Sequence, residues 1–126
     1  QDPQSGTWYQ VTDQGAREGN YLESSATALF IYTLAKAVNK GYIGKDYIQP
    51  TRKAFDGMVK TFTRLEEDGS YTITNCCAVA GLGGDSKRYR DGSFEYYISE
   101  PVIENDPKSV GSFILAAIEY EKMTDK

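Results

Sequence analysis

Apolar residues recur at helical spacing between positions 20 and 40 and predict a long helix. Asn20, followed three residues later by Glu23, resembles a capping box, and Gly41 stands where a helix commonly ends in a left-handed residue. The apolar positions cover most of the circumference, so we expect this helix to be buried on most sides. These positions are Ala26, Ala28, Leu29, Phe30, Ile31, Tyr32, Leu34, Ala35, Ala37 and Val38.

A second helix is expected over about residues 46–67, with one apolar stripe and one charged face. Pro50 is compatible with it because the residue falls in or next to the first turn, and Asp68 with Gly69 ends the element. This is the pattern of an outer helix that is covered on one side only. The stripe consists of Tyr47, Thr51, Ala54, Phe55, Met58, Val59 and Phe62.

The chain between the second helix and the last helix has no long periodic pattern. Short strands are expected at 70–74 and at 94–98, where alternation would turn one of Tyr96 and Tyr97 inward. The last helix has a clear start signal, with Asp106 as its cap and Pro107 in its first position. Its apolar residues again cover most of the circumference.

This order of buried, amphipathic and buried helices predicts an all-α fold that forms part of an α/α toroid. We expect an incomplete ring of about three helices, with a loop-rich segment that holds short strands, in a single domain over residues 1–126. Inner helices of such a ring begin at the same mouth. The segments 19–25 and 100–109 enter the two inner helices here, so we expect both to face a common site.

Composition excludes several function classes. The chain has no His, which removes Ser-His-Asp and Cys-His catalysis and the commonest metal ligand. No calcium-loop spacing is present, so no metal is expected. The net charge of -4, from 14 basic and 18 acidic residues, argues against nucleic-acid binding. No stretch is long enough to span a membrane, and without an initiator Met we expect a fragment of a longer protein.

Three short features are typical of ordinary structure. Cys76 and Cys77 are adjacent and have no other Cys to pair with, so we expect two reduced thiols beside a core strand, with a vicinal redox switch as the alternative. The glycines of 80–84 favour a flexible turn over a phosphate loop, because no third glycine is correctly spaced and no helix follows. The basic run 87–90 is typical of a solvated loop.

Residues 89–101 combine aromatic rings with carboxylates, hydroxyls and an arginine. A protein core does not require this mixture, because every buried polar group needs a partner. A pyranose ring, in contrast, offers one apolar face for stacking and a rim of hydroxyls for hydrogen bonds. The segment therefore predicts a sugar-binding surface.

Five blocks in a fixed order resemble unsaturated rhamnogalacturonyl hydrolases of glycoside hydrolase family 105. They are GTWYQV at 6–11, GNYLESSA at 19–26, VAGLGG at 79–84, DGSFEYY at 91–97 and SEP at 99–101. The resemblance extends from about residue 6 to residue 121. It implies an (α/α)6 barrel of six helical hairpins, of which this chain would be the C-terminal portion.

The resemblance also implies an activity. Family members remove an unsaturated galacturonyl residue from pectin-derived rhamnogalacturonan oligosaccharides. An aspartic acid protonates the C4=C5 double bond, water adds at C5, and the resulting hemiketal collapses. No metal or organic cofactor is implied. The catalytic Asp and the residues that grip the sugar belong to the upstream half, so no catalytic residue is assigned here and the fragment alone is expected to be inactive.

We expect this chain to supply one wall of the substrate site. The candidate substrate-binding residues are Arg17, Asn20, Tyr21, Glu23 and Ser24 at one helix entry, and Arg90, Asp91, Ser93, Tyr96 and Tyr97 in the other segment. Structural roles stay open beside these. They are capping for Asn20 and Glu23, a solvated or capping charge for Glu95 and Glu100, and a simple turn for Asp91 with Gly92. For Trp8, both packing in the core or between helices and stacking on a sugar stay open.

Two functional classes therefore remain. The chain is either part of a hydrolase that is active only within the whole barrel, or a non-catalytic half-barrel that binds carbohydrate or has a structural role. The expected partners are an unsaturated oligosaccharide and, for the open helical faces, a second copy of the chain or the missing N-terminal half. Neither nucleic acid nor membrane is expected as a partner.

Overall fold

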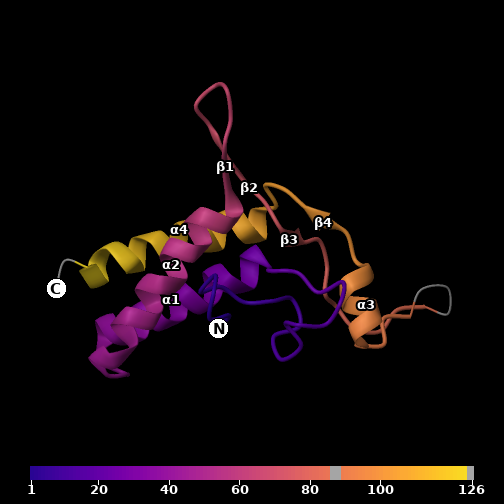
Figure 1. Ribbon diagram of the computed structural model, residues 1–126, viewed down its shortest axis with the longest axis horizontal. Helices are drawn as coiled ribbons and strands as arrows, with labels where there is room; N and C mark the ends of the chain where they lie inside the picture. Colours follow the sequence, from indigo (N-terminus) through magenta and orange to yellow (C-terminus); the bar gives the residue numbers. More distant parts are fainter. Residues whose placement is uncertain (86–88, 125–126) are drawn as a thin grey trace.

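The computed structural model describes residues 1–85 and 89–124, and helices dominate it (Figure 1). The helices are α1 (Ser24–Lys40), the 3-10 turn η1 (Lys45–Tyr47), α2 (Ile48–Phe62), α3 (Phe94–Ser99) and α4 (Pro107–Thr124). Two short antiparallel pairs accompany them: β1 (Thr63–Leu65) with β2 (Tyr71–Ile73), and β3 (Cys76–Cys77) with β4 (Val102–Ile103). The predicted all-α class is confirmed.

Helix α1 begins later than the sequence predicted, and its cap is a different residue. Glu23 is the N-cap, and its carboxylate accepts from the backbone N–H groups of Ser25 and Ala26. The prediction that Asn20 caps this helix is wrong, because the Asn20 side chain bonds to the preceding loop instead. The end of the helix was predicted correctly, since Gly41 has a φ of 71° and closes α1 with two backbone hydrogen bonds.

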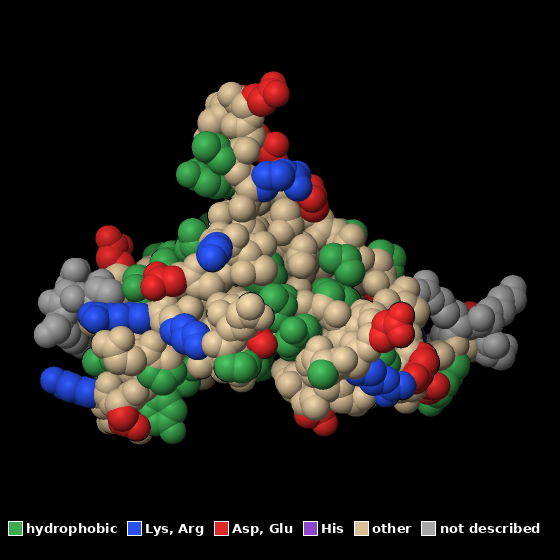
Figure 2. Space-filling view, viewed as in Figure 1, with side chains coloured by type: hydrophobic (Ala, Val, Ile, Leu, Met, Phe, Trp, Pro, Cys, Tyr) green, Lys and Arg blue, Asp and Glu red, His purple; other side chains and the backbone are tan. Residues whose placement is uncertain are grey.

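Helix α2 ends at Phe62, five residues before the predicted end at position 67. The chain turns there into a hairpin because β1 pairs with β2, the strand that the sequence predicted at 70–74. Asp68 and Gly69 consequently form the hairpin turn rather than a helix end, and Gly69 has a φ of 84°. Figure 2 shows this hairpin projecting from the body, with hydrophobic side chains on one side and charged ones on the other.

The segment 94–98 is helix α3, so the predicted strand is wrong. Ser93 decides the outcome, because its hydroxyl accepts a hydrogen bond of 3.1 Å from the backbone N–H of Tyr96 and so caps a helix. Tyr96 and Tyr97 therefore do not alternate between two faces. Both are half-buried, and their ring centroids lie 4.9 Å apart.

The core lies where α1, α2 and α4 meet. Helix α1 packs most extensively against α4, and α2 packs on both of them. The stacked rings of Phe55 and Tyr120, with centroids 3.9 Å apart, join α2 to α4. The fully buried cluster consists of Ala28, Ile31, Ala54, Met58, Phe62 and Ala116.

Helices α1 and α4 are not buried on most sides, contrary to the sequence-based expectation. Leu29 and Phe30 of α1 are 48% and 40% exposed, and Ile114 of α4 is 54% exposed. Within residues 1–85 and 89–124, these side chains are only partly covered, and the ring of Trp8 contacts that of Phe30. Each of the two helices thus exposes apolar side chains, which we call together the open face and define as Leu29, Phe30, Ile114, Leu115 and Ile118. None of the helices in the described part of the chain has the length and hydrophobicity needed to cross a lipid bilayer.

Candidate carbohydrate-binding site

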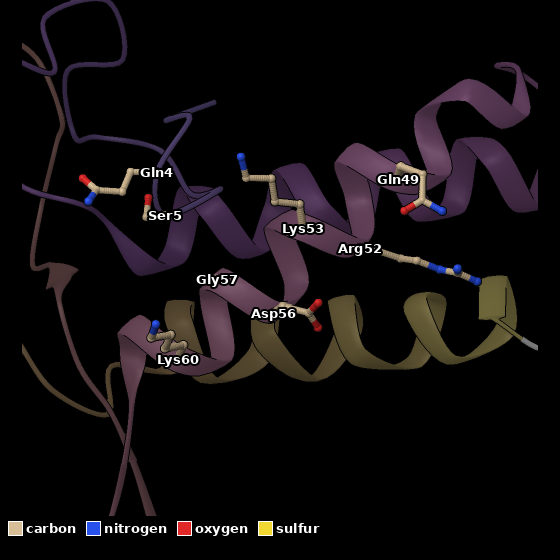
Figure 3. A pocket seen from close by; sticks show the side chains of 8 residues that line it. All are labelled: Gln4, Ser5, Gln49, Arg52, Lys53, Asp56, Gly57 and Lys60. Atoms are coloured by element: carbon tan, nitrogen blue, oxygen red, sulfur yellow. The ribbon is translucent and has the colours of Figure 1, made fainter.

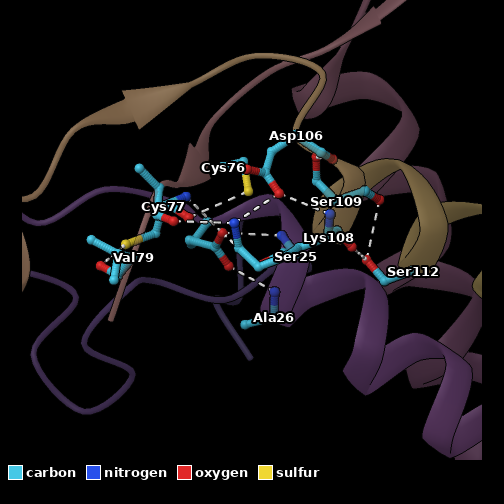
Figure 4. Close-up of polar contacts among 11 residues, drawn as sticks. Ser25, Ala26, Cys76, Cys77, Val79, Asp106, Lys108, Ser109 and Ser112 are labelled. Carbon is cyan, nitrogen blue, oxygen red and sulfur yellow. Dashed lines mark hydrogen bonds and ion pairs between the residues drawn. The ribbon is translucent and has the colours of Figure 1, made fainter. Parts of the chain in front are cut away.

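The two helix entries meet through the carboxylate of Glu23. Its Oε1 accepts from the backbone N–H of Cys77 at 3.0 Å, and its two oxygens together cap α1 through Ser25 and Ala26 at 2.7 to 3.1 Å (Figure 4). Cys77 pairs in turn with Val102, just before α4 begins. The start of α1 and the approach to α4 are therefore adjacent, and the capping role considered for Glu23 is the one observed.

The loop that leads into α1 is shaped by Asn20. The Asn20 amide donates to the carbonyls of Val11 and Gln14 at 2.9 and 2.8 Å, which closes the loop on itself. Trp8 precedes this loop and packs against the core, with its ring 5.0 Å from that of Phe30 in an edge-on arrangement. Core packing, one of the two roles considered for Trp8, is therefore observed.

Arg17 joins this loop to α3. The guanidinium lies 3.8 Å from the centroid of the Phe94 ring, forms an ion pair with Glu95, and donates to the side chain of Gln14 at 2.8 Å. Gly19 lies directly against Ile98 of α3, where a Cβ atom would come within 2.8 Å of the Ile98 side chain. The fold thus brings the candidate residue Arg17 against Glu95, which is 78 positions away in sequence.

Arg90 is held by a buried carboxylate. Its Nε lies 3.2 Å from Oε1 of Glu100, and the Glu100 side chain is only 1% exposed. The solvated charge considered for Glu100 is therefore wrong, and the adjacent guanidinium makes burial of the carboxylate tolerable. The Arg90 backbone also pairs with Gly83. Lys87 and Arg88, the other cations of the predicted solvated loop, lie outside the described residues.

Asp91 and Ser93 serve the local backbone. The Asp91 carboxylate accepts from the backbone N–H of Ser93 at 2.9 Å, which lowers the pKa of Asp91 below its ordinary value. Gly92, between them, has a φ of 78° that favours glycine. The turn considered for Asp91 with Gly92 is therefore observed, and Ser93, which follows it, is the N-cap of α3. Tyr96, one turn later, donates its hydroxyl to the carbonyl of Gly81.

Two candidate hydroxyls are buried without a hydrogen-bond partner among the described residues, those of Tyr21 and Ser24. Burial raises the pKa of Tyr21 above its ordinary value, and the nearby Cys77 thiol adds to the shift. Cys76 and Cys77 are free and buried, as the sequence predicted. The Cys77 thiol accepts from the side chain of Gln10 at 3.3 Å and donates to the carbonyl of Val79 at 3.1 Å.

Sequence reasoning missed the link between Glu23 and Cys77. The partners are 54 residues apart, and the group on Cys77 is a backbone N–H that every residue but proline carries, so no sequence signal marks it. It also missed Glu95 as the partner of Arg17. Only the position of Glu95 beside Ser93, at the start of an unrecognised helix, could have pointed to it.

A separate cavity of about 450 Å³ lies on the outer side of α2 (Figure 3). Lys53 extends there towards Gln4, whereas Arg52 extends away from them, towards the C-terminal end of α4. None of the candidate sugar-binding residues lines this cavity. No group of three or more His, Cys, Asp or Glu within residues 1–85 and 89–124 could hold a metal ion.

Comparison with known proteins identifies bacterial relatives of this chain. The family model described as Glycosyl Hydrolase Family 88 matches residues 1–124. Protein Atu3128 of Agrobacterium fabrum and the 24.9 kDa protein in the picA locus of Rhizobium radiobacter are each 39% identical over 120 residues. Each match covers 92% of this chain and 52% of the relative, so the chain spans about half the length of these curated proteins.

Solved structures agree with the resemblance found in the sequence blocks. A family 105 glycoside hydrolase from C. acetobutylicum ATCC 824 shares 45% sequence identity at a TM-score of 0.92, over 96% of this chain and 33% of that chain. A possible member of the GH105 family from Salmonella enterica shares 28% identity at a TM-score of 0.75, over 99% and 28% of the two chains. The fold described here is therefore that of about one third of a longer barrel.

Proposed function

Because the chain belongs to Glycosyl Hydrolase Family 88, we propose that it forms one wall of the substrate site of a glycosidase. The substrate is a pectin (rhamnogalacturonan) oligosaccharide that ends in an unsaturated galacturonyl residue. The reaction hydrates the C4=C5 double bond of that residue and releases it. The proton-donating Asp comes from outside this chain, so residues 1–126 alone do not catalyse the reaction.

One observation carries this proposal. The loop that contains Arg17 and the helix α3 lie together at the end of the molecule where α1 and α4 begin (Figure 1). A loop and a short helix are thereby held against each other, with aromatic and charged groups between them. Such a surface offers both the apolar faces and the polar groups that a pyranose ring requires.

The candidate residues divide into two roles. Arg17, Arg90, Tyr96 and Tyr97 are partly exposed, and we assign them the sugar contacts. The remaining candidates position the backbone or have buried hydroxyls, and we assign them no direct sugar contact. These are Asn20, Tyr21, Glu23, Ser24, Asp91 and Ser93.

A chimaera tests the proposed function. Residues 1–124 would replace the matched third of the family 105 glycoside hydrolase from C. acetobutylicum. We expect the chimaera to remove the ultraviolet absorbance of the double bond in an unsaturated galacturonyl-rhamnose disaccharide, and the 126-residue chain alone to leave it unchanged. Turnover by the isolated chain would contradict the assignment of the catalytic acid, and a folded chimaera that hydrolyses only saturated sugars would contradict the substrate.

Tyr97→Ala in the chimaera addresses the sugar contacts directly. We expect it to raise KM several-fold with a smaller change in kcat, because a stacking face is lost without loss of the acid. Tyr42→Ala is the matched control, since Tyr42 is 79% exposed and lies beyond the far end of α1. Equal kinetics for the two variants would remove Tyr97 from the proposed site.

The open face favours a second candidate function. A partial barrel that exposes Leu29, Phe30 and Ile114 has a surface suited to pairing with apolar helices. In this alternative the chain is a non-catalytic carbohydrate-binding or structural module that associates with itself. Detection of catalysis by the chimaera, together with a monomeric isolated chain, would exclude it.

A further inference from the structure

The cavity on the outer side of α2 carries positive charge that no carboxylate neutralises. Arg52, Lys53 and Lys60 line it, and Asp56 is the one acidic residue among the described residues of the lining. These four side chains leave a net charge of +2 at the cavity, in a chain whose total is -4. In the described part of the chain, none of the three cations forms a salt bridge.

The hydrogen-bond donors of these cations are available to a ligand. Lys60 has no hydrogen-bond partner among the described residues, and Lys53 donates to the carbonyl of Pro3, which carries no charge. The Nε of Arg52 is buried and also lacks a partner among the described residues. A buried donor without a partner raises the free energy of the fold, and an anion at that end of the cavity would supply one.

Lys53 and Lys60 lie two turns apart on the same side of α2. Seven residues rise about 10 Å along a helix, and the flexible four-carbon stem of lysine allows both ammonium groups to approach one anion between them. Gly57, between the two, has no side chain to fill that space, and the N-terminal segment rests on it through Ser5. The arrangement is therefore a cationic pair beside an open stretch of helix.

The charge of the cavity favours a phosphate group over a carboxylate. A phosphomonoester carries about two negative charges near neutral pH, which matches the net charge of the lining, whereas a carboxylate carries one. Ammonium and guanidinium groups form strong, charge-assisted hydrogen bonds with phosphate oxygens. Aromatic rings are absent from the described residues of the lining, so the cavity lacks the faces on which a sugar ring stacks.

We propose that this cavity binds a small phosphorylated molecule, with the phosphate group held between Lys53 and Lys60. A volume of about 450 Å³ is larger than a phosphate group needs and lies within the range of about 300–1,000 Å³ that is usual for small-molecule sites. The Asp56 carboxylate and the amides of Gln4 and Gln49 are suited to hydroxyl groups on the rest of the ligand. The inference does not rest on the proposed function, because the two sites share no residue.

Nuclear magnetic resonance titration of the 126-residue chain at low ionic strength tests the proposal. The three probes are glucose 6-phosphate, glucuronate and glucose, which present a dianion, a monoanion and a neutral group at the same carbon. We expect glucose 6-phosphate to bind about tenfold more tightly than glucuronate, and the amide signals of residues 49–60 to follow its binding. Glucose should leave these signals unchanged.

Inorganic phosphate, as a fourth probe, separates an esterified ligand from the free anion. We expect it to move the same signals but to bind several-fold more weakly than glucose 6-phosphate. It offers no further hydroxyl groups to Asp56 and the two glutamine amides.

Two variants change the charge of the cavity in opposite directions. Lys60→Gln should weaken binding of glucose 6-phosphate about fivefold, and it removes no hydrogen bond from the described structure. Asp56→Asn should tighten binding of inorganic phosphate several-fold, because a repelling carboxylate is gone, and a gain in affinity cannot arise from misfolding. Lys40→Gln is the control, since it makes the same change in net charge at an exposed position of α1 outside the cavity and should leave both affinities unchanged.

Four results would overturn the inference. They are equal binding of glucose 6-phosphate and glucuronate, signal changes confined to residues outside 49–60, an unchanged affinity in Lys60→Gln, and weaker binding of inorganic phosphate by Asp56→Asn. Equal affinities for inorganic phosphate and glucose 6-phosphate would overturn the assignment of an esterified ligand.

Discussion

Glu23 is the residue on which the local geometry of the site depends most. Glu23 is 1% exposed, and its carboxylate accepts hydrogen bonds from N–H and O–H donors of Ser25, Ala26 and Cys77. Two of these donors belong to the first turn of α1, where the helix dipole also favours a negative charge. One carboxylate therefore starts a helix and ties it to a strand.

We expect Glu23→Ala to lower the free energy of unfolding by about 2–4 kcal/mol. The substitution removes a helix cap and leaves the buried N–H of Cys77 without its partner. Urea denaturation of the two proteins measures the difference. Glu95→Ala is the control, because the exposed Glu95 side chain should contribute little. Similar losses in both variants would contradict the linking role of Glu23.

Among the elements, those with a local start signal could be predicted from the sequence. Asp106 and Pro107 mark the beginning of α4, and the structure places it there because the Asp106 carboxylate accepts from the backbone of Lys108. Helix α3 was missed because its aromatic residues have a high strand propensity, and the capping hydroxyl of Ser93 outweighs that propensity. The end of α2 was missed because the hairpin that ends it depends on pairing with β2.

The two glycines inside helices should respond oppositely to substitution by alanine. Gly57 of α2 lies under the N-terminal segment, where a Cβ atom would come within 1.9 Å of the Ser5 carbonyl oxygen. Gly57→Ala must displace that segment, so we expect it to destabilise the protein by about 1–3 kcal/mol. Gly111 of α4 has open space at the same position, so Gly111→Ala should stabilise by about 0.5–1 kcal/mol.

Thermal unfolding of both variants measures these changes in stability. Circular dichroism follows the loss of helix in each case. The comparison is controlled internally, because both substitutions remove the same backbone freedom from a helix. A gain in stability for Gly57→Ala would show that the N-terminal segment does not rest on α2 in solution. A loss for Gly111→Ala would indicate a neighbour at that position.

At the scale of the whole molecule, the open face predicts self-association. Leu29, Ile114 and Ile118 are between 44% and 54% exposed, which favours burial against a second copy of the chain. We expect sedimentation velocity to show dimers or larger species that increase with concentration. Ile114→Lys should shift the distribution towards monomer, whereas Leu65→Lys, at an exposed site on the hairpin, should not. A monomer at all concentrations with a cooperative unfolding transition would contradict this.

Stability should fall on the acid side of the pH range. Hydrogen bonds and an ion pair with Lys108 hold the pKa of Asp106 below its ordinary value of 3.8, and Arg64 holds the pKa of Glu104 below 4.5. A lowered pKa in the folded state means that the unfolded chain takes up protons first. The stabilisation is complete above about pH 4.5 and is lost as the pH falls further. Urea denaturation at several pH values should show a smaller acid loss for Asp106→Asn.

The alkaline side follows from groups whose pKa is raised. Burial raises the pKa of Cys76 above 9.0 and that of Tyr21 above 10.0. The unfolded chain therefore loses these protons first, so stability should decrease as the pH rises above about 9. The chain has no His, so we expect little change between pH 5.5 and 8. A steep change within that interval would contradict the assignment of these groups.

The site as a whole was less predictable than its residues. The sequence indicated which segments carry polar and aromatic groups, but not which of these groups form hydrogen bonds with the backbone. Asp91 and Asn20 were candidates by residue type, and both are engaged in turns. Arg17 contacts Glu95 only when the loop and α3 pack together. Local sequence does not encode this contact, because the two residues are far apart along the chain.

The pairing of β3 with β4 has a consequence for how this molecule can vary. The N–H of Ala78 donates to the carbonyl of Pro101 at 2.9 Å, so the segment between these residues is closed at its base, and α3 within it also contacts the loop that carries Arg17. A segment closed at its base can change in length and composition at little cost in loop entropy. The segment 79–100 can therefore be exchanged as a unit between related proteins. Transplanting it between relatives is a route to new sugar preferences on an unchanged scaffold.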